Sequence, residues 1–122
     1  LQSELKQWPI QLNLVSTGAE YLKNADLLIA ADCTAYAYAN FHKEFIKGRI
    51  TLIGCPKLDD TAYYVEKLTE MFLRNNIRSV TVVRMQVPCC GGIVGAVKSA
   101  MLKAQTIVPY TEVTITPDGR II

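Results

Sequence analysis

Apolar runs of strand-like length alternate along this chain with segments whose apolar residues recur at helical spacing. Three of the runs, at residues 25–31, 49–54 and 77–84, are almost wholly apolar. Such runs are typical of parallel strands buried on both faces. Two further segments, residues 10–14 and 110–116, alternate apolar and polar positions, which predicts strands with one exposed face. The pattern therefore predicts five strands.

Helical periodicity fills the intervals between these strands. Small polar residues precede the helical segments, where their side chains can accept hydrogen bonds from the first backbone N–H groups. The expected helices, with their expected N-caps, are residues 19–24 (Ser16 or Thr17), residues 35–47 (Thr34), residues 61–74 (Asp59 or Asp60) and residues 92–104.

Strands that alternate with helices predict a parallel sheet covered on both faces. We therefore expect a three-layer, Rossmann-like (flavodoxin-like) α/β fold, with a mostly parallel sheet and helices on both faces. After a turn at residues 117–120, the last two residues are expected to pair back as a hairpin. In such folds ligands bind outside the carboxyl ends of the strands.

Size and charge narrow the classes of function. The chain has 122 residues, about half of them apolar, and a net charge of +2. We expect one domain over residues 1–122. Because basic residues are not clustered, we expect no nucleic-acid partner. No apolar run approaches the roughly 20 residues of a membrane span. No secretion signal is evident and residue 1 is not Met, so we expect a cytoplasmic protein and the C-terminal part of a longer chain.

The four cysteines follow three successive predicted strands. Cys33 comes after residues 25–31, Cys55 comes after residues 49–54, and the pair Cys89-Cys90 comes after residues 77–84. Because the carboxyl ends of parallel strands meet at one edge, we expect all four thiols to lie at that edge. In a reducing compartment, cysteines gathered in this way indicate metal or redox chemistry.

The spacing Cys-x21-Cys-x33-Cys-Cys leaves several functions open. Four thiolates match a [4Fe-4S] cluster, with Cys90 the less certain ligand because adjacent cysteines need a constrained backbone to reach one cluster. Zinc also takes four thiolates, but adjacent ligands fit its small sphere poorly, so a zinc-stapled binding module is an alternative. A thiol–disulfide oxidoreductase is another, in which Cys89 or Cys90 attacks and Cys33 or Cys55 resolves.

Three glycines flank these cysteines: Gly54 directly before Cys55, and Gly91 and Gly92 directly after Cys90. Glycine lets the backbone approach a ligand closely. Backbone N–H groups that bond to the sulfurs help set the potential of a cluster. We therefore predict that Gly54, Gly91 and Gly92 take part in cofactor binding, although a tight turn explains each of them equally well.

Four segments together resemble a family of anaerobe proteins known as 4Fe-4S ferredoxin-type iron–sulfur-binding proteins. They are WPIQL at residues 8–12, DLLIAADC at residues 26–33, IGCPKLD at residues 53–59 and VPCCG at residues 87–91. The resemblance covers nearly the whole chain and is to the C-terminal domain of that family, which follows an N-terminal domain with two ferredoxin-type clusters. The CCG element is also similar to a short part of the Cys-Cys-Gly domain of heterodisulfide reductases.

The resemblance implies electron transfer in anaerobic metabolism, with a redox partner protein or an attached ferredoxin domain as partner. Combined with the residue pattern, it leads us to expect one [4Fe-4S] cluster on Cys33, Cys55, Cys89 and Cys90. It does not identify a substrate or a catalytic residue.

Overall fold

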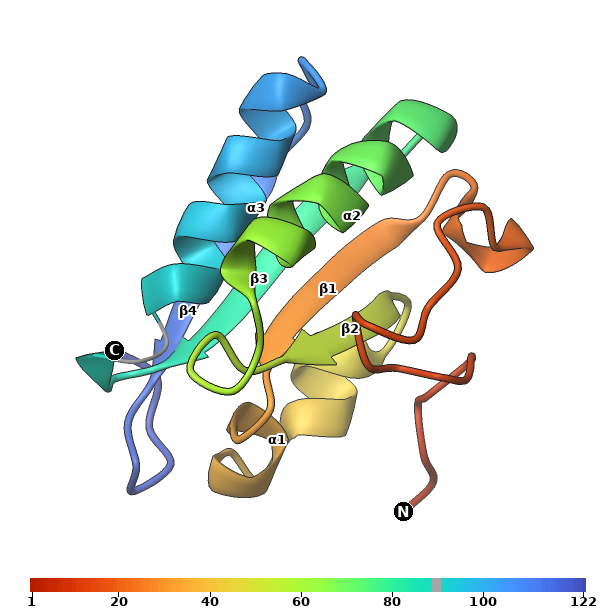
Figure 1. The fold of residues 1–122 in the computed structure, drawn as a ribbon. Coiled ribbons are helices and arrows are strands. Elements are labelled where there is room, and N and C mark those ends of the chain that lie inside the picture. Colours follow the sequence, from red (N-terminus) through yellow and green to blue (C-terminus); the bar gives the residue numbers. More distant parts are fainter. Residues whose placement is uncertain (89–90) are drawn as a thin grey trace.

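The protein is described by a computed structural model over residues 1–88 and 91–122. Figure 1 shows its single parallel sheet, in which the strands lie in the order β2-β1-β3-β4. The strands are β1 (Asp26–Ala31), β2 (Ile50–Gly54), β3 (Ser79–Met85) and β4 (Tyr110–Ile115). The three wholly apolar runs are therefore strands, as predicted, and all three neighbouring pairs are parallel.

Helices cover both faces of this sheet, which confirms the predicted three-layer, Rossmann-like fold. On one face, α2 (Thr61–Arg74) and α3 (Gly91–Lys103) lie side by side and run roughly along the strands (Figure 1). On the other face lie α1 (Thr34–Ala37) and the π-helix η2 (His42–Ile46). The central strand β1 is buried on both faces: Leu27 and Ile29 pack beneath α2 and α3, and Leu28 packs toward η2.

The strand order creates one switch point in the sheet. From β1 the chain passes outward to β2, and from β2 it returns across β1 to β3 on the other side. The connections after β1 and β3 therefore leave in opposite directions, and ligands of such folds bind at the carboxyl ends of strands related in this way. The residues that follow Ala31 and Met85 lie at these two strand ends.

The prediction of a strand at residues 10–14 is wrong. Only Gln11 forms a bridge, to Ile53, and the chain then turns, with the N–H groups of Leu14 and Val15 donating back to the carbonyl of Gln11. The alternation in sequence reflects this turn, which buries Leu12 and Val15 and leaves Leu14 exposed.

The N-terminal segment nevertheless covers the outer edge of β2. The side chain of Gln7 donates to the carbonyl of Thr51 at 2.5 Å, and the N–H of Leu12 donates to the carbonyl of Ile53 at 2.8 Å. The N–H of Ile53 donates in turn to the carbonyl of Ile10 at 2.8 Å. These bonds satisfy edge groups that would otherwise be available to another chain.

The continuous helix predicted over residues 35–47 is also wrong. The chain leaves helical geometry at Tyr38, whose hydroxyl donates to Glu44, and it resumes as η2. Phe41, at the N-cap of this wider helix, and Phe45 and Ile46 within it are all buried against the sheet. Helical spacing in the sequence identified the buried residues, but it did not reveal the interruption.

Two expected N-caps differ in the structure. Cys33 holds the N-cap position of α1, and Thr34 instead donates its hydroxyl to the carbonyl of Ala31 at 2.8 Å. The short 3₁₀ helix η1 (Glu20–Leu22) has Ala19 at its N-cap, without a side-chain bond. By contrast Asp60 caps α2 as predicted, accepting from the N–H of Ala62 at 2.9 Å.

The end of the chain follows the predicted hairpin, with an antiparallel bridge between Ile115 and Ile121. In the described part of the chain, no helix combines the length and apolar character needed to cross a membrane.

Candidate functional site

The loops that carry Cys33 and Cys55 begin next to each other at the carboxyl edge of the sheet. Ala31 and Gly54 are register partners at the ends of β1 and β2. Asp32 follows Ala31, and its N–H donates to the carbonyl of Gly54 at 3.0 Å. The residues that precede the two cysteines are thus hydrogen-bonded to each other. Cys33 is exposed, Cys55 is partly exposed, and neither belongs to a disulfide within the described residues.

The start of α3, which follows the cysteine pair in the sequence, meets the loop that carries Cys55. Cys89 and Cys90 lie outside the described residues, but Gly92, two residues beyond them, lies in the first turn of α3. A Cβ placed on Gly92 would lie 2.9 Å from the Cβ of Pro56, which follows Cys55. The close packing of Gly92 on Pro56 therefore joins the start of α3 to the loop that carries Cys55.

Gly54 is also required by packing. A Cβ at this position would lie 2.8 Å from the Cζ of Tyr64 in α2. The hydroxyl of Tyr64 accepts a hydrogen bond from the N–H of Cys55 at 3.0 Å and donates one to the carboxylate of Asp59. The fully buried Tyr64 thus packs on Gly54, holds the backbone N–H of Cys55 and bonds to the side chain of Asp59.

The three predicted cofactor glycines therefore have different surroundings. Gly54 and Gly92 each have a packing reason that holds with or without a ligand. Gly91 is less confined: the atom nearest to a Cβ added there would belong to the guanidinium of Arg84, at 4.0 Å. The role of these glycines in cofactor binding stays a prediction.

Sequence analysis did not single out Tyr64 as a site residue, because its apolar spacing in α2 is also typical of a core tyrosine. The available signal was the order of residues: a glycine and a cysteine end one strand, and a tyrosine follows in the first turn of the next helix. This order of residues is compatible with a contact between Tyr64 and the Cys55 loop, but it does not by itself predict that contact.

Two carboxylates give the edge a negative character. Burial raises the pKa of Asp32, and the nearby carboxylate of Asp59 raises it further, while the amide of Gln11 opposes both effects. Burial and the hydrogen bond to Asp59 raise the pKa of Tyr64 as well. Among residues 1–88 and 91–122, neither Asp32 nor Asp59 forms an ion pair.

Metal binding by the described side chains alone is not supported. Within residues 1–88 and 91–122, no three or more His, Cys, Asp or Glu side chains lie close enough together to hold a metal ion. The only histidine, His42, lies in η2 and accepts a hydrogen bond from the N–H of Glu4 at 3.2 Å. A metal centre at this edge therefore needs Cys89 and Cys90 in addition to Cys33 and Cys55.

Comparisons with known proteins identify the fold but no activity. Residues 19–122 match a family described as "Rossmann-like domain". An uncharacterized protein of Archaeoglobus fulgidus is 34% identical over 87 residues, which are 71% of this chain and 61% of the relative. The chain thus spans less than two thirds of that relative's length. No solved structure matches the chain. The resemblance to 4Fe-4S ferredoxin-type proteins stays a prediction.

Proposed function

This chain belongs to the Rossmann-like domain family, and on that premise we propose that its carboxyl edge holds one [4Fe-4S] cluster and that the domain transfers electrons. The proposed ligands are Cys33, Cys55, Cys89 and Cys90. A cluster of this kind supplies one-electron chemistry, with a potential set by nearby charges, hydrogen bonds and exposure.

One observation carries the proposal: the backbone that precedes Cys33 is hydrogen-bonded to the backbone that precedes Cys55, by the 3.0 Å contact from Asp32 to Gly54. In the sequence 21 residues separate Cys33 from Cys55, and the sheet brings their loops together. The packing of Gly92 on Pro56 adds the segment that follows Cys90 to the same edge.

The donor set fits a cluster in its chemistry. Thiolates are the usual ligands of iron–sulfur clusters. Among residues 1–88 and 91–122, Cys33 and Cys55 are free thiols that belong to no disulfide, Cys33 is exposed and Cys55 is partly exposed. The N–H of Cys55 is already bonded to Tyr64, so this group is not free to bond to a sulfide. The bond to Tyr64 instead holds the loop of Cys55 in place.

The exposure of Cys33 indicates where a partner would dock. A cluster near the surface can exchange electrons with a redox partner protein or with an attached ferredoxin domain, which are the partners we propose. Free thiols are also consistent with a reducing compartment such as the cytoplasm, which forms part of the proposal.

The same exposure favours a second candidate, a thiol–disulfide oxidoreductase. An accessible free thiol such as Cys33 can take part in disulfide exchange without any metal. This candidate requires Cys33 or Cys55 to form a disulfide bond with Cys89 or Cys90 during turnover.

The deciding experiment is anaerobic purification, followed by an absorption spectrum and counts of iron and acid-labile sulfide. We expect a brown protein that bleaches with dithionite, with iron and sulfide near four each. Cys55→Ser should lose most of the iron, while Gly95→Ala, at an open position in α3, should keep it. A colourless, iron-free protein that reduces a disulfide would favour the thiol enzyme. Stoichiometric zinc without redox activity would favour a zinc-stapled module.

A further inference from the structure

The two outer edges of the sheet differ in how they are covered. The N-terminal segment bonds along the outer edge of β2, whereas β4 forms the opposite edge. The end of β4 is covered by the last residues of the chain, because the N–H of Ile122 donates to the carbonyl of Thr114 at 3.0 Å. Within residues 1–88 and 91–122, the outer side of β4 before Thr114 pairs with no other strand. An uncovered edge of this kind is a template for another chain.

The bonds already made show which backbone groups of β4 point outward. Along a strand, alternate residues direct their N–H and C=O groups to opposite edges. The carbonyls of Pro109 and Ile115 accept hydrogen bonds from the β3 side, at 2.9 and 2.8 Å, whereas Thr114 bonds outward. Tyr110 and Glu112 alternate in step with Thr114. Their backbone N–H and C=O groups therefore point to the open edge.

Oppositely charged side chains lie along this open stretch, on the face that carries α3. Nζ of Lys98 in α3 lies 3.7 Å from Oε1 of Glu112. It also lies 5.7 Å from the centroid of the Tyr110 ring, two residues earlier in β4. Lys98 and Glu112 are both accessible to solvent. The edge therefore presents a positive group beside Tyr110 and a negative group at Glu112.

Apolar side chains flank the same stretch. An open groove of about 820 Å³ lies between the end of α3 and the start of β4, and Met101, Leu102, Ile107 and Tyr110 are among its lining residues. Ile107 is 97% exposed, and Leu102 is exposed as well. At the other end of the open stretch, Ile122 is also exposed. Apolar patches of this kind, rimmed by charged residues, mark surfaces that bind other proteins.

We propose that β4 pairs with β4 of a second copy of this chain, so that the two sheets continue into one. A two-fold axis makes the two strands antiparallel and repeats every contact. With the axis at Thr111, Tyr110 of one copy lies opposite Glu112 of the other, and the two residues exchange both of their outward backbone hydrogen bonds. The contact involves none of the cysteine loops, so it does not depend on the proposed cluster.

Charge favours this register over its neighbour. Opposed residues of an antiparallel pair have Cβ atoms about 4.5–5.5 Å apart. With Tyr110 opposite Glu112, each carboxylate comes near the Lys98 that lies over the opposing ring. Each Glu112 is then placed between two lysines, one from each copy. A register centred on Glu112 would instead oppose two carboxylates, which is destabilising.

The same register brings apolar side chains together. It places Thr114 of one copy opposite Val108 of the other. Ile122 bonds to Thr114, and Ile107 precedes Val108, so these two exposed isoleucines approach each other across the contact. Burial of apolar surface that the single chain leaves in water favours the association.

The test is sedimentation equilibrium of the full chain over a range of concentrations, together with amide exchange followed by NMR. We expect a monomer–dimer equilibrium in which the mass doubles toward high concentration. The amides of Tyr110 and Glu112 should gain protection as the dimer forms, whereas those of Thr111 and Val113 face β3 and should be protected throughout. A monomer at every concentration up to the millimolar range would overturn the proposal and leave the edge to a different chain.

Two charge variants test the contact across the axis. Glu112→Lys and Lys98→Glu should each raise the dimer dissociation constant at least tenfold, because each opposes like charges twice. Mixed in equal amounts, the two variants should dimerise with each other, since each then meets the opposite charge. The repulsion within each copy is the same in the mixture, so this recovery reports on the contact between copies.

Glu66→Lys, at an exposed position of α2, is the matched control and should leave the dissociation constant unchanged. A dimer that Glu112→Lys leaves intact would overturn the proposal. So would a mixture of the two charge variants that stays monomeric.

Discussion

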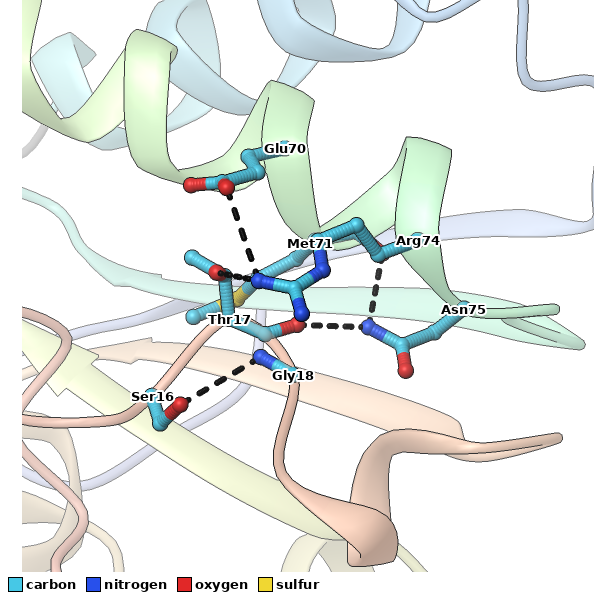
Figure 2. Close-up of polar contacts among 7 residues, drawn as sticks. All are labelled: Ser16, Thr17, Gly18, Glu70, Met71, Arg74 and Asn75. Carbon is cyan, nitrogen blue, oxygen red and sulfur yellow. Dashed lines mark hydrogen bonds and ion pairs between the residues drawn. The ribbon is translucent and has the colours of Figure 1, made fainter.

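The side-chain amide of Asn75 donates a hydrogen bond of 2.8 Å to the carbonyl of Thr17, 58 residues earlier in the chain. Figure 2 shows this bond beside the guanidinium of Arg74, which donates to the Thr17 hydroxyl and also pairs with Glu70. Asn75 therefore joins the end of α2 to the loop that enters the sheet. Because that loop follows the segment covering β2, the contact helps to hold the N-terminal part of the chain in place.

We predict that Asn75→Ala lowers the free energy of unfolding by about 1–2 kcal/mol, because it leaves the carbonyl of Thr17 without its donor. Asn76→Ala is the matched control, since Asn76 is exposed and, among residues 1–88 and 91–122, its side chain bonds to the side chain of Asn24 alone. It should change stability by less than about 0.5 kcal/mol. Urea denaturation of both variants measures the difference, and equal effects would contradict the assigned role of Asn75.

Gly54 and Tyr64 should show coupled effects on stability. Gly54→Ala places a methyl group against the phenol and should cost about 1–3 kcal/mol. Tyr64→Phe removes the nearest obstructing atom, and it also leaves the N–H of Cys55 without its acceptor. In the Tyr64→Phe background, Gly54→Ala should therefore cost less than in the wild type. A double-mutant cycle measures this coupling, and strictly additive effects would refute the contact.

Two glycines of α3 provide a second matched pair. Gly95 is exposed with open space around it, so Gly95→Ala should stabilise the protein by about 0.5–1 kcal/mol through the higher helix propensity of alanine. Gly92→Ala should destabilise it, because the added methyl meets Pro56 at 2.9 Å. Thermal unfolding compares the two variants. If Gly92→Ala stabilised the protein as much as Gly95→Ala, the packing of α3 on the Cys55 loop would be wrong.

Tyr110 should ionise late in an alkaline titration. Its pKa is raised to about 12, mainly by burial. The negative charge of Glu112 and the hydrogen bond that Tyr110 donates to it contribute in the same direction. An unfolded tyrosine ionises near pH 10. Its contribution to the free energy of unfolding is therefore fully present below about pH 10 and is lost as the pH rises toward about 12.

Absorbance at 295 nm, recorded as the difference between wild type and Tyr110→Phe, isolates this group from the other tyrosines. Glu112→Gln should move its midpoint toward pH 10, because the substitution removes the repelling charge. A midpoint near 10 in the unmodified chain would show that Tyr110 is not shielded as described.

The buried strands and the capped helix α2 were predictable because their signals are local. A run of apolar residues can form a buried strand only when both faces are covered, and the polar residues around it mark its ends. Asp60, directly before residues 61–74, is similarly a local signal for an N-cap, and in the structure Asp60 caps α2. Covered strands separated by helices determine a parallel sheet, and hence the single edge at which Cys33 and Cys55 lie.

The failures came where distant contacts outweigh local pattern. Helical spacing continues through residues 38–41, but burial of Phe41 and Phe45 against the sheet, with the Tyr38 bond to Glu44, favours a break and a π-helix. Alternation at residues 10–14 suits a strand, yet the chain there gains more from burying Leu12 and Val15 in a turn than from pairing.

The sequence by itself determined the Rossmann-like sheet and the edge at which the loops of Cys33 and Cys55 begin, because hydrophobic periodicity and chain order carry that information. Only the tertiary structure decided that Tyr64 holds the Cys55 loop, that Gly92 packs on Pro56, and that Lys98 reaches Glu112. These relationships join residues that are far apart in the chain. They depend on side-chain volumes and hydrogen-bond partners that meet only once the layers have packed.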